Sequence, residues 1–179
     1  MTTVMTKADP KLPSEDGPDV FGSSSAKGTA ALSTDTTWYF LQMTYNDNNG
    51  KKTTGFCIEN TTTYWNNYLM VSTGPTALAL RFRKNIVIKN PDGKEWIRWQ
   101  LGNGRFLSVR DGGWMKSQIE GVNPPLWYGG FDGNYSLIND WNNYPVSAWY
   151  QSTPFEGYYY WLYAATQENA CKCEWVKAD

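Results

Sequence analysis

Residues 103–117, NGRFLSVRDGGWMKS, carry the clearest structural signal in this chain. The segment opens with Asn and Gly, runs through aromatic and aliphatic residues, and reaches Asp111-Gly-Gly before a second run begins at Trp114. Asp and Gly adopt the backbone angles of tight turns, and short runs of this composition are typical of strands. The segment therefore predicts two antiparallel strands, at 105–110 and 114–119, joined by a turn.

Similar short runs fill the chain on either side of this hairpin. Gly, Asn, Asp and Pro separate them, with strong turn signals at 46–50 (NDNNG) and 90–93 (NPDG). No window keeps a 3.6-residue apolar period, so we expect little helix. About a dozen strands at this spacing indicate a β-sandwich or a closed barrel. The other expected strands are 38–45, 55–59, 68–73, 77–83, 86–89, 96–101, 135–138, 146–151, 158–164 and 171–176.

Three segments of the sequence are alike, which indicates an internal repeat. Segments 67–82, 104–119 and 157–175 each open with Gly or Asn, run through one strand, turn, and return on a second. Hairpins that recur every 40–50 residues or so are typical of a threefold barrel. The stretch 103–117 also resembles the hairpin that recurs in β-trefoil proteins, including fascin-like and lectin modules. This resemblance implies an all-β, single antiparallel domain with a β-trefoil fold and a lectin-like function.

A second resemblance favours a β-sandwich instead. Residues 133–140 (GNYSLIND) and 146–161 (VSAWYQSTPFEGYYYW) are similar to the aromatic strands and Pro-Phe cluster of small cytolytic β-sandwiches, the aegerolysins and actinoporin-like proteins. This resemblance implies a protein that binds membrane lipid through exposed aromatic rings. The β-trefoil is the first choice and the β-sandwich its close alternative.

The composition changes near Trp38 and divides the chain in two. Residues 1–37 hold one aromatic residue, Phe21, and a Gly/Ser-rich tract at 22–28. Such a stretch buries too little apolar surface to offset the entropy of ordering it. We therefore expect a flexible N-terminal arm or linker over 1–37 and an all-β binding domain over 38–179. An arm that orders on a neighbouring subunit is the alternative.

Several kinds of chemistry are excluded by composition. The chain has no histidine, which removes Ser-His and Cys-His nucleophile pairs and every imidazole metal site. Sixteen basic against seventeen acidic residues give no field for nucleic acid. The three cysteines are too few for a four-thiolate zinc cage; a bridge from Cys57 to Cys171 or Cys173 is open, although the reduced state is favoured. We expect no enzyme, no cofactor, no metal and no nucleic-acid partner.

The surplus is aromatic: ten Trp, twelve Tyr and seven Phe. Many of these rings lie in segments rich in Asn, Asp and Gly rather than in apolar runs, so we expect them to be partly exposed. Sugar recognition combines an aromatic face with amides and carboxylates that read the hydroxyl groups. The candidate ligand-binding residues are Trp65, Asn103, Asp111, Trp114, Trp127, Tyr128, Asp132, Asn134, Trp141 and Tyr144.

The sequence thus predicts a non-enzymatic, lectin-like protein whose partners are glycans or glycoconjugates. One alternative is a cytolytic or pore-forming toxin that binds membrane lipid through the same rings. Another is a self-assembling structural or interaction protein, a homo-oligomer joined through the N-terminal arm. The sequence contains no recognisable signal peptide or apolar run long enough to cross a bilayer, so we expect a cytoplasmic protein or one secreted by a non-classical route.

Overall fold

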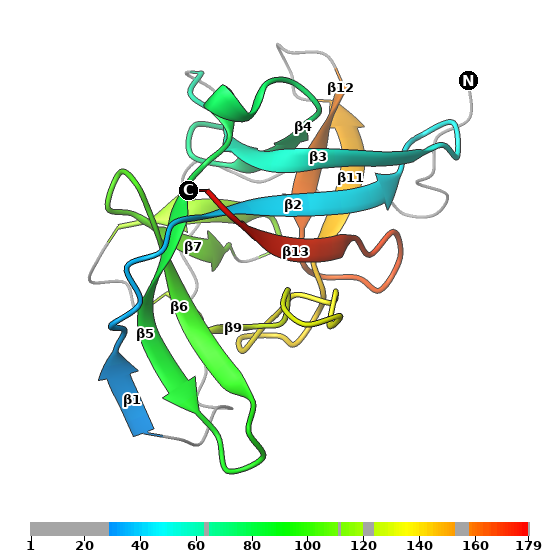
Figure 1. Ribbon diagram of the computed structural model, residues 1–179. Helices are drawn as coiled ribbons and strands as arrows, with labels where there is room; N and C mark the ends of the chain where they lie inside the picture. The colour runs from blue at the N-terminus through cyan, green and yellow to red at the C-terminus, as the bar shows by residue number, and fades with distance from the viewer. Residues whose placement is uncertain (1–28, 63–64, 111, 120–123, 153–157, 179) are drawn as a thin grey trace.

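The structure, a computed structural model, describes residues 29–62, 65–110, 112–119, 124–152 and 158–178. In this part of the chain thirteen strands form a single curled antiparallel sheet, and one short 3-10 helix lies between two of them in sequence (Figure 1). The prediction of an all-β, single antiparallel domain with little helix is confirmed. The elements are β1 (Thr29–Leu32), β2 (Tyr39–Asn46), β3 (Lys52–Glu59), β4 (Leu69–Ser72), η1 (Thr76–Leu78), β5 (Phe82–Lys89), β6 (Glu95–Leu101), β7 (Phe106–Val109), β8 (Met115–Gln118), β9 (Trp127–Tyr128), β10 (Ile138–Asn139), β11 (Ser147–Ser152), β12 (Tyr158–Tyr163) and β13 (Lys172–Lys177).

Strand β2 shows how the sequence specifies these elements. Its side chains alternate between the core and the outer face, with Leu41, Met43 and Tyr45 buried. Successive side chains of a strand point to opposite faces, so a two-residue period of this kind fixes which face packs inward. The strand ends at the turn 47–51, where Gly50 has a φ of 79° and supplies the left-handed residue of a three-residue hairpin loop.

Pairing makes β2 the centre of the sheet. It pairs with β3 on one side and β13 on the other, and these three strands lie side by side in Figure 1. Near its start it also meets β5, through Tyr39 and Phe82. From there the path runs through β6 and β9 to β10. The main core lies inside this curl and contains the fully buried Leu41, Phe82, Trp99 and Trp127.

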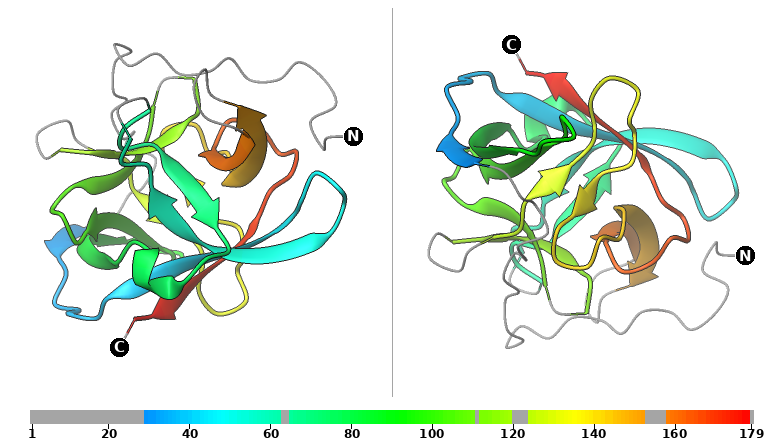
Figure 2. Two further views of the ribbon diagram at one scale, coloured as in Figure 1. Left: turned by 90° about the horizontal axis from the view of Figure 1, so that it is seen from above. Right: turned by 90° about the horizontal axis from the view of Figure 1, so that it is seen from below.

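Three hairpins, β3–β4, β7–β8 and β11–β12, meet one another at one end of the molecule. β4 pairs with β12 through Met70 and Trp161. Two isolated bridges, Tyr68 to Lys116 and Trp114 to Tyr163, join the other two pairs of hairpins. Each hairpin therefore contacts both of the others around a shared centre; Figure 2 shows the sheet from above and from below. A second cluster of buried side chains fills this centre: Tyr68, Met70, Trp114, Trp149 and Trp161.

Some details of the predicted organisation are corrected. The predicted hairpin at 105–119 forms as β7–β8, but β4 does not pair with β5, nor β12 with β13, so segments 67–82 and 157–175 are not hairpins. The expected strand over 77–83 is wrong in its first half, where η1 lies. Residues 29–32, expected in the arm, form β1 and pair with β5, so ordered structure begins ahead of residue 38; residues 1–28 of the expected arm lie outside the described residues.

Candidate functional site

A recess of about 630 Å³ lies between the β5–β6 turn and the segment that joins β9 to β10. We call it the β6–β9 recess. Its lining combines aromatic rings with carboxylates, ammonium groups and an amide: Lys84, Asp92, Gly93, Lys94, Glu95, Ile97, Tyr128, Gly129, Phe131, Asp132 and Asn134.

The β5–β6 turn supplies one wall of this recess. The amide of Asn90 donates to the carbonyl of Lys94 over 2.8 Å, and Gly93, with a φ of 88°, occupies the left-handed position of the loop. The carboxylate of Asp92 accepts a hydrogen bond of 2.9 Å from the amide of Lys94. This Asx contact stabilises the turn and holds the Asp92 carboxylate beside the recess.

The opposite wall is a sharp turn after β9. Asp132 and Gly133 have φ values of 53° and 82°, and the amide of Asn134 donates to the carbonyl of Phe131 over 2.9 Å. Positive φ at both central residues is the type I′ geometry that Asp-Gly favours. Before this turn, Gly129 has a φ of 113°, and a Cβ at that position would lie 1.9 Å from the carbonyl oxygen of Ser136. Only glycine fits there, so the path of the wall depends on it.

Two rings in the recess each lie beneath a lysine. The Nζ of Lys94 lies 5.3 Å from the ring centroid of Tyr128, and the Nζ of Lys84 lies 5.0 Å from that of Phe131. Tyr128 also packs at 5.6 Å against the ring of Trp96. Each ring therefore has a lysine ammonium group over it, and Tyr128 is also supported by Trp96. A ligand with an apolar face can displace Lys94 from Tyr128 without disturbing the core.

One of the two lysines of the recess, Lys84, forms an ion pair. Lys84 is held by Asp35, whose carboxylate lies 3.7 Å from its Nζ and also accepts a hydrogen bond of 3.0 Å from the Tyr39 hydroxyl. Partial burial acts to raise the pKa of Asp35, but hydrogen bonds from Thr37 and Tyr39 and the charge of Lys84 outweigh it, so this pKa lies below its usual 3.8.

The acidic side chains that line the recess differ from Asp35, which does not line it. Among the described residues, no ion pair joins Asp92, Glu95 or Asp132 to a lysine or arginine. Their carboxylates are therefore available to accept hydrogen bonds from the hydroxyl groups of a ligand. No group of three or more metal-ligating side chains occurs among the described residues.

The recess brings together Tyr128, Asp132 and Asn134 of the residues predicted to bind ligand. The other described candidates lie elsewhere. Asn103 is in the β6–β7 turn, where its amide donates to the Glu59 carboxylate over 3.2 Å. Trp65 and Trp141 are half-buried, and Tyr144 is 39% exposed, but none of them lines the recess. Asp111 lies outside the described residues.

The expectation that the candidate rings are exposed is wrong for Trp114 and Trp127. Trp114 is 2% exposed, and Trp127 is fully buried, with its Nε1 donating to the carbonyl of Leu107 over 3.1 Å. The neighbouring glycines reflect close packing instead: a Cβ on Gly113 would lie 2.4 Å from the Cβ of Ala165. Glycine beside Trp114 here lets neighbouring side chains pack closely against the backbone, so it does not indicate an exposed ring.

Sequence reasoning missed Lys84, Lys94, Asp92 and Phe131 as members of the site. The recess lies between two Asp-Gly turns, Asp92-Gly93 and Asp132-Gly133, and the first was recognised only as a turn signal. Two such turns close in space form a concave polar rim, but they are 40 residues apart in sequence, and strand pairing decides whether they meet.

No family model, curated protein or solved structure matches this chain. In the described part of the chain no helix has the length and apolar character needed to cross a membrane. The three cysteines are buried and free, so none of the open bridge pairings is present.

Proposed function

We propose that this protein is a non-enzymatic, lectin-like protein that binds carbohydrate in the β6–β9 recess. The observation that carries this proposal is the convergence of Tyr128, Asp132 and Asn134 on one recess. They supply a ring, a carboxylate and an amide, the combination that holds the C–H face of a sugar and reads its hydroxyl groups. Lys94 and Asp92 add a further donor and acceptor.

We also propose that the strands from β2 to β13 form a β-trefoil. In such a fold three units of four strands contribute to a barrel, and three hairpins close one of its ends. The mutual contacts of β3–β4, β7–β8 and β11–β12 support this assignment. The pairing of the first of these strands, β2, with the last, β13, supports it further, because a closed barrel leaves no open edge between them.

A glycan array probed with fluorescently labelled protein tests the binding proposal. We expect selective binding to a few related glycans, competed by the free sugar. Tyr128→Ala removes the ring that faces the recess, and Asp132→Asn removes a charge at an exposed turn position where Asn accepts the same positive φ. Both should weaken binding at least fivefold, whereas Tyr144→Ala, at an exposed tyrosine outside the recess, should leave it unchanged.

The result that counts against this site is equally clear. If Tyr128→Ala and Asp132→Asn bind as the unaltered protein does, the recess is not where glycans bind. A blank array counts against carbohydrate binding altogether.

A second candidate function, docking on membrane lipid followed by lysis of the bilayer, rests on other residues. Tyr144 and Tyr159 are 39% and 43% exposed, and residues 144–163 contain no Lys or Arg. Tyrosine rings favour the headgroup region of a bilayer, and a segment without cations suits a neutral lipid. Dye release from phosphatidylcholine vesicles separates the two functions, because a protein that only binds sugars releases no dye.

A further inference from the structure

A second, smaller recess lies on the outer face of the sheet, across β13, β2 and β3. Its volume is about 270 Å³, and we call it the β2–β13 recess. The strand register explains its lining. Lys172 lies opposite Thr44, and Glu174 opposite Gln42, while the residue between them on β13, Cys173, points into the core. The full lining is Gln42, Thr44, Lys52, Tyr135, Lys172 and Glu174.

Tyr135 forms the rim of this recess. Its backbone is fixed to β13, because its carbonyl accepts a hydrogen bond of 2.7 Å from the amide of Cys173. Its ring nevertheless remains 40% exposed, and the Nζ of Lys172 lies 5.6 Å from the ring centroid. An aromatic ring held in place and left open to solvent is an available contact surface for a ligand.

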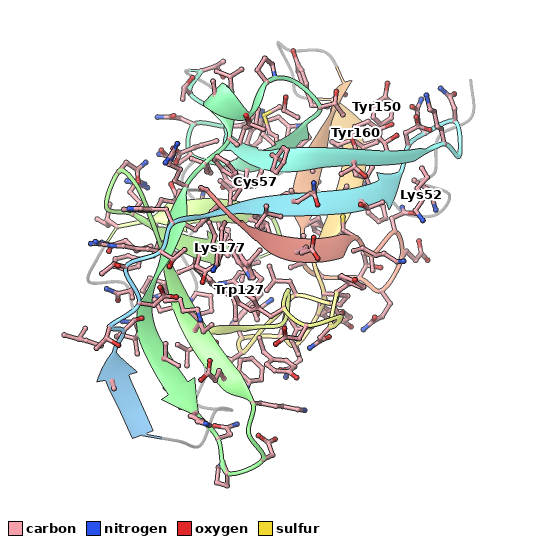
Figure 3. All side chains as sticks on the ribbon, viewed as in Figure 1. Lys52, Cys57, Trp127, Tyr150, Tyr160 and Lys177 are labelled. Carbon is pink, nitrogen blue, oxygen red and sulfur yellow. The ribbon has the colours of Figure 1, made fainter. Side chains whose placement is uncertain are left out.

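The charged groups of this recess favour an anion. Two ammonium groups, those of Lys52 and Lys172, face one carboxylate, that of Glu174. Among the described residues, neither lysine forms an ion pair. Gln42 and Thr44 add groups that hydrogen-bond to hydroxyls. Lys52 lies at the turn end of this face, far along the sheet from Lys177 (Figure 3).

We infer that the β2–β13 recess binds the acidic group of a carboxylated or sulfated sugar, with Lys172 and Lys52 as its cationic contacts and Tyr135 against the sugar ring. That the ligand is a sugar rests on the proposed function, whereas the location of the anion site does not. The two recesses adjoin in sequence, since Asn134 lines the first and Tyr135 the second.

Titration with a matched pair of sugars, followed by two-dimensional NMR of the labelled full chain, tests this inference. Glucuronate and glucose share a ring and differ at one position, where glucuronate carries the carboxylate. We expect saturable shifts from glucuronate at Gln42, Thr44 and Lys172, and much weaker ones from glucose. Because the contacts are exposed to solvent, Lys172→Met and Lys52→Met should each weaken glucuronate binding about two- to fivefold, and added salt should weaken it too.

Lys177→Met is the matched control, because Lys177 lies on the same strand but does not line the recess. Three results would overturn the inference: equal shifts from both sugars, no shift at Lys172, or an equal loss in Lys177→Met. The Tyr128→Ala variant distinguishes a failure of the anion-site inference from a failure of the proposed sugar site in the β6–β9 recess. Unchanged array binding in Tyr128→Ala, together with a loss in Lys172→Met, would remove the β6–β9 recess and leave the anion site standing.

Discussion

Replacing Trp127 by alanine should unfold the domain more readily, whatever it does to ligand binding. Trp127 lies on β9, next to β6, and its side chain is fully buried in the core (labelled in Figure 3). Removing a buried tryptophan costs about 3–5 kcal/mol, through lost burial and the cavity that remains. The deletion also leaves the carbonyl of Leu107 without the 3.1 Å hydrogen bond from Nε1. We therefore expect the free energy of unfolding to fall by about 3–5 kcal/mol.

Equilibrium unfolding in urea, followed by far-UV circular dichroism, measures this change. Tyr144→Ala is the control, since its ring is 39% exposed, and it should cost less than about 1 kcal/mol. Trp127→Phe keeps most of the volume and should lie between the two variants, which guards against the alanine variant failing to fold. A loss below about 1 kcal/mol in Trp127→Ala would refute the reasoning from burial.

Three further predictions concern backbone strain, thiols and pH. Gly112 and Gly113 both have a φ of 101°, but only Gly113 lacks room for a Cβ. In urea unfolding, Gly113→Ala should therefore destabilise the domain by about 1–3 kcal/mol more than Gly112→Ala does. Equal losses in the two variants would contradict this reasoning. Burial raises the pKa of the Cys171 thiol to about 12 and raises the pKa of the other two cysteine thiols as well. A thiol reagent at pH 8 should therefore label the native protein very slowly, whereas the protein unfolded in guanidinium should be labelled at all three thiols. Rapid native labelling would contradict it. Because folding lowers the pKa of Asp35, its ionised form stabilises the domain above pH 3.8, and this stability is lost as the pH falls through the lowered pKa. Asp35→Asn should therefore lower the free energy of unfolding by about 1 kcal/mol at pH 7 and by progressively less below pH 3.8. A loss that does not depend on pH would disprove the ionic contribution.

Local signals in the sequence predicted most of the strands, although β1 and β9 were not expected and the strand expected over 135–138 is reduced to Ile138 of β10. The β7–β8 hairpin was predictable because Asp111-Gly-Gly separates two strand-like runs, and the β5–β6 turn because Asn-Pro-Asp-Gly has one favoured geometry. What local signals do not encode is which strands become neighbours. Segment 67–82 looks like a hairpin, yet β4 pairs with β3 and β12, because burial of Met70 beside Trp161 decides its partner.

The candidate site was predictable only in part, for a related reason. Tyr128, Asp132 and Asn134 follow one another closely in sequence, so a single polar aromatic segment revealed them. Lys84 and Asp92 join them through strand pairing, which no local pattern reports. The burial of Trp127 was missed because the flanking Gly129-Gly130 pair has the composition of an exposed loop, although it serves a close approach to Ser136 and Trp175.

The pairing of β2 with β13 has a consequence for how the chain reaches its native state. Tyr39 lies opposite Lys177, and the amide of Ala178 donates to the carbonyl of Trp38 over 2.8 Å, so this pairing joins segments from opposite ends of the described chain. Loop-closure entropy opposes such a contact until the intervening strands have formed. Proteins dominated by non-local pairing of this kind fold in milliseconds to seconds rather than microseconds. The pairing of β13 with β2 is then a late step in folding, and until it occurs β2 presents an unpaired edge to other chains.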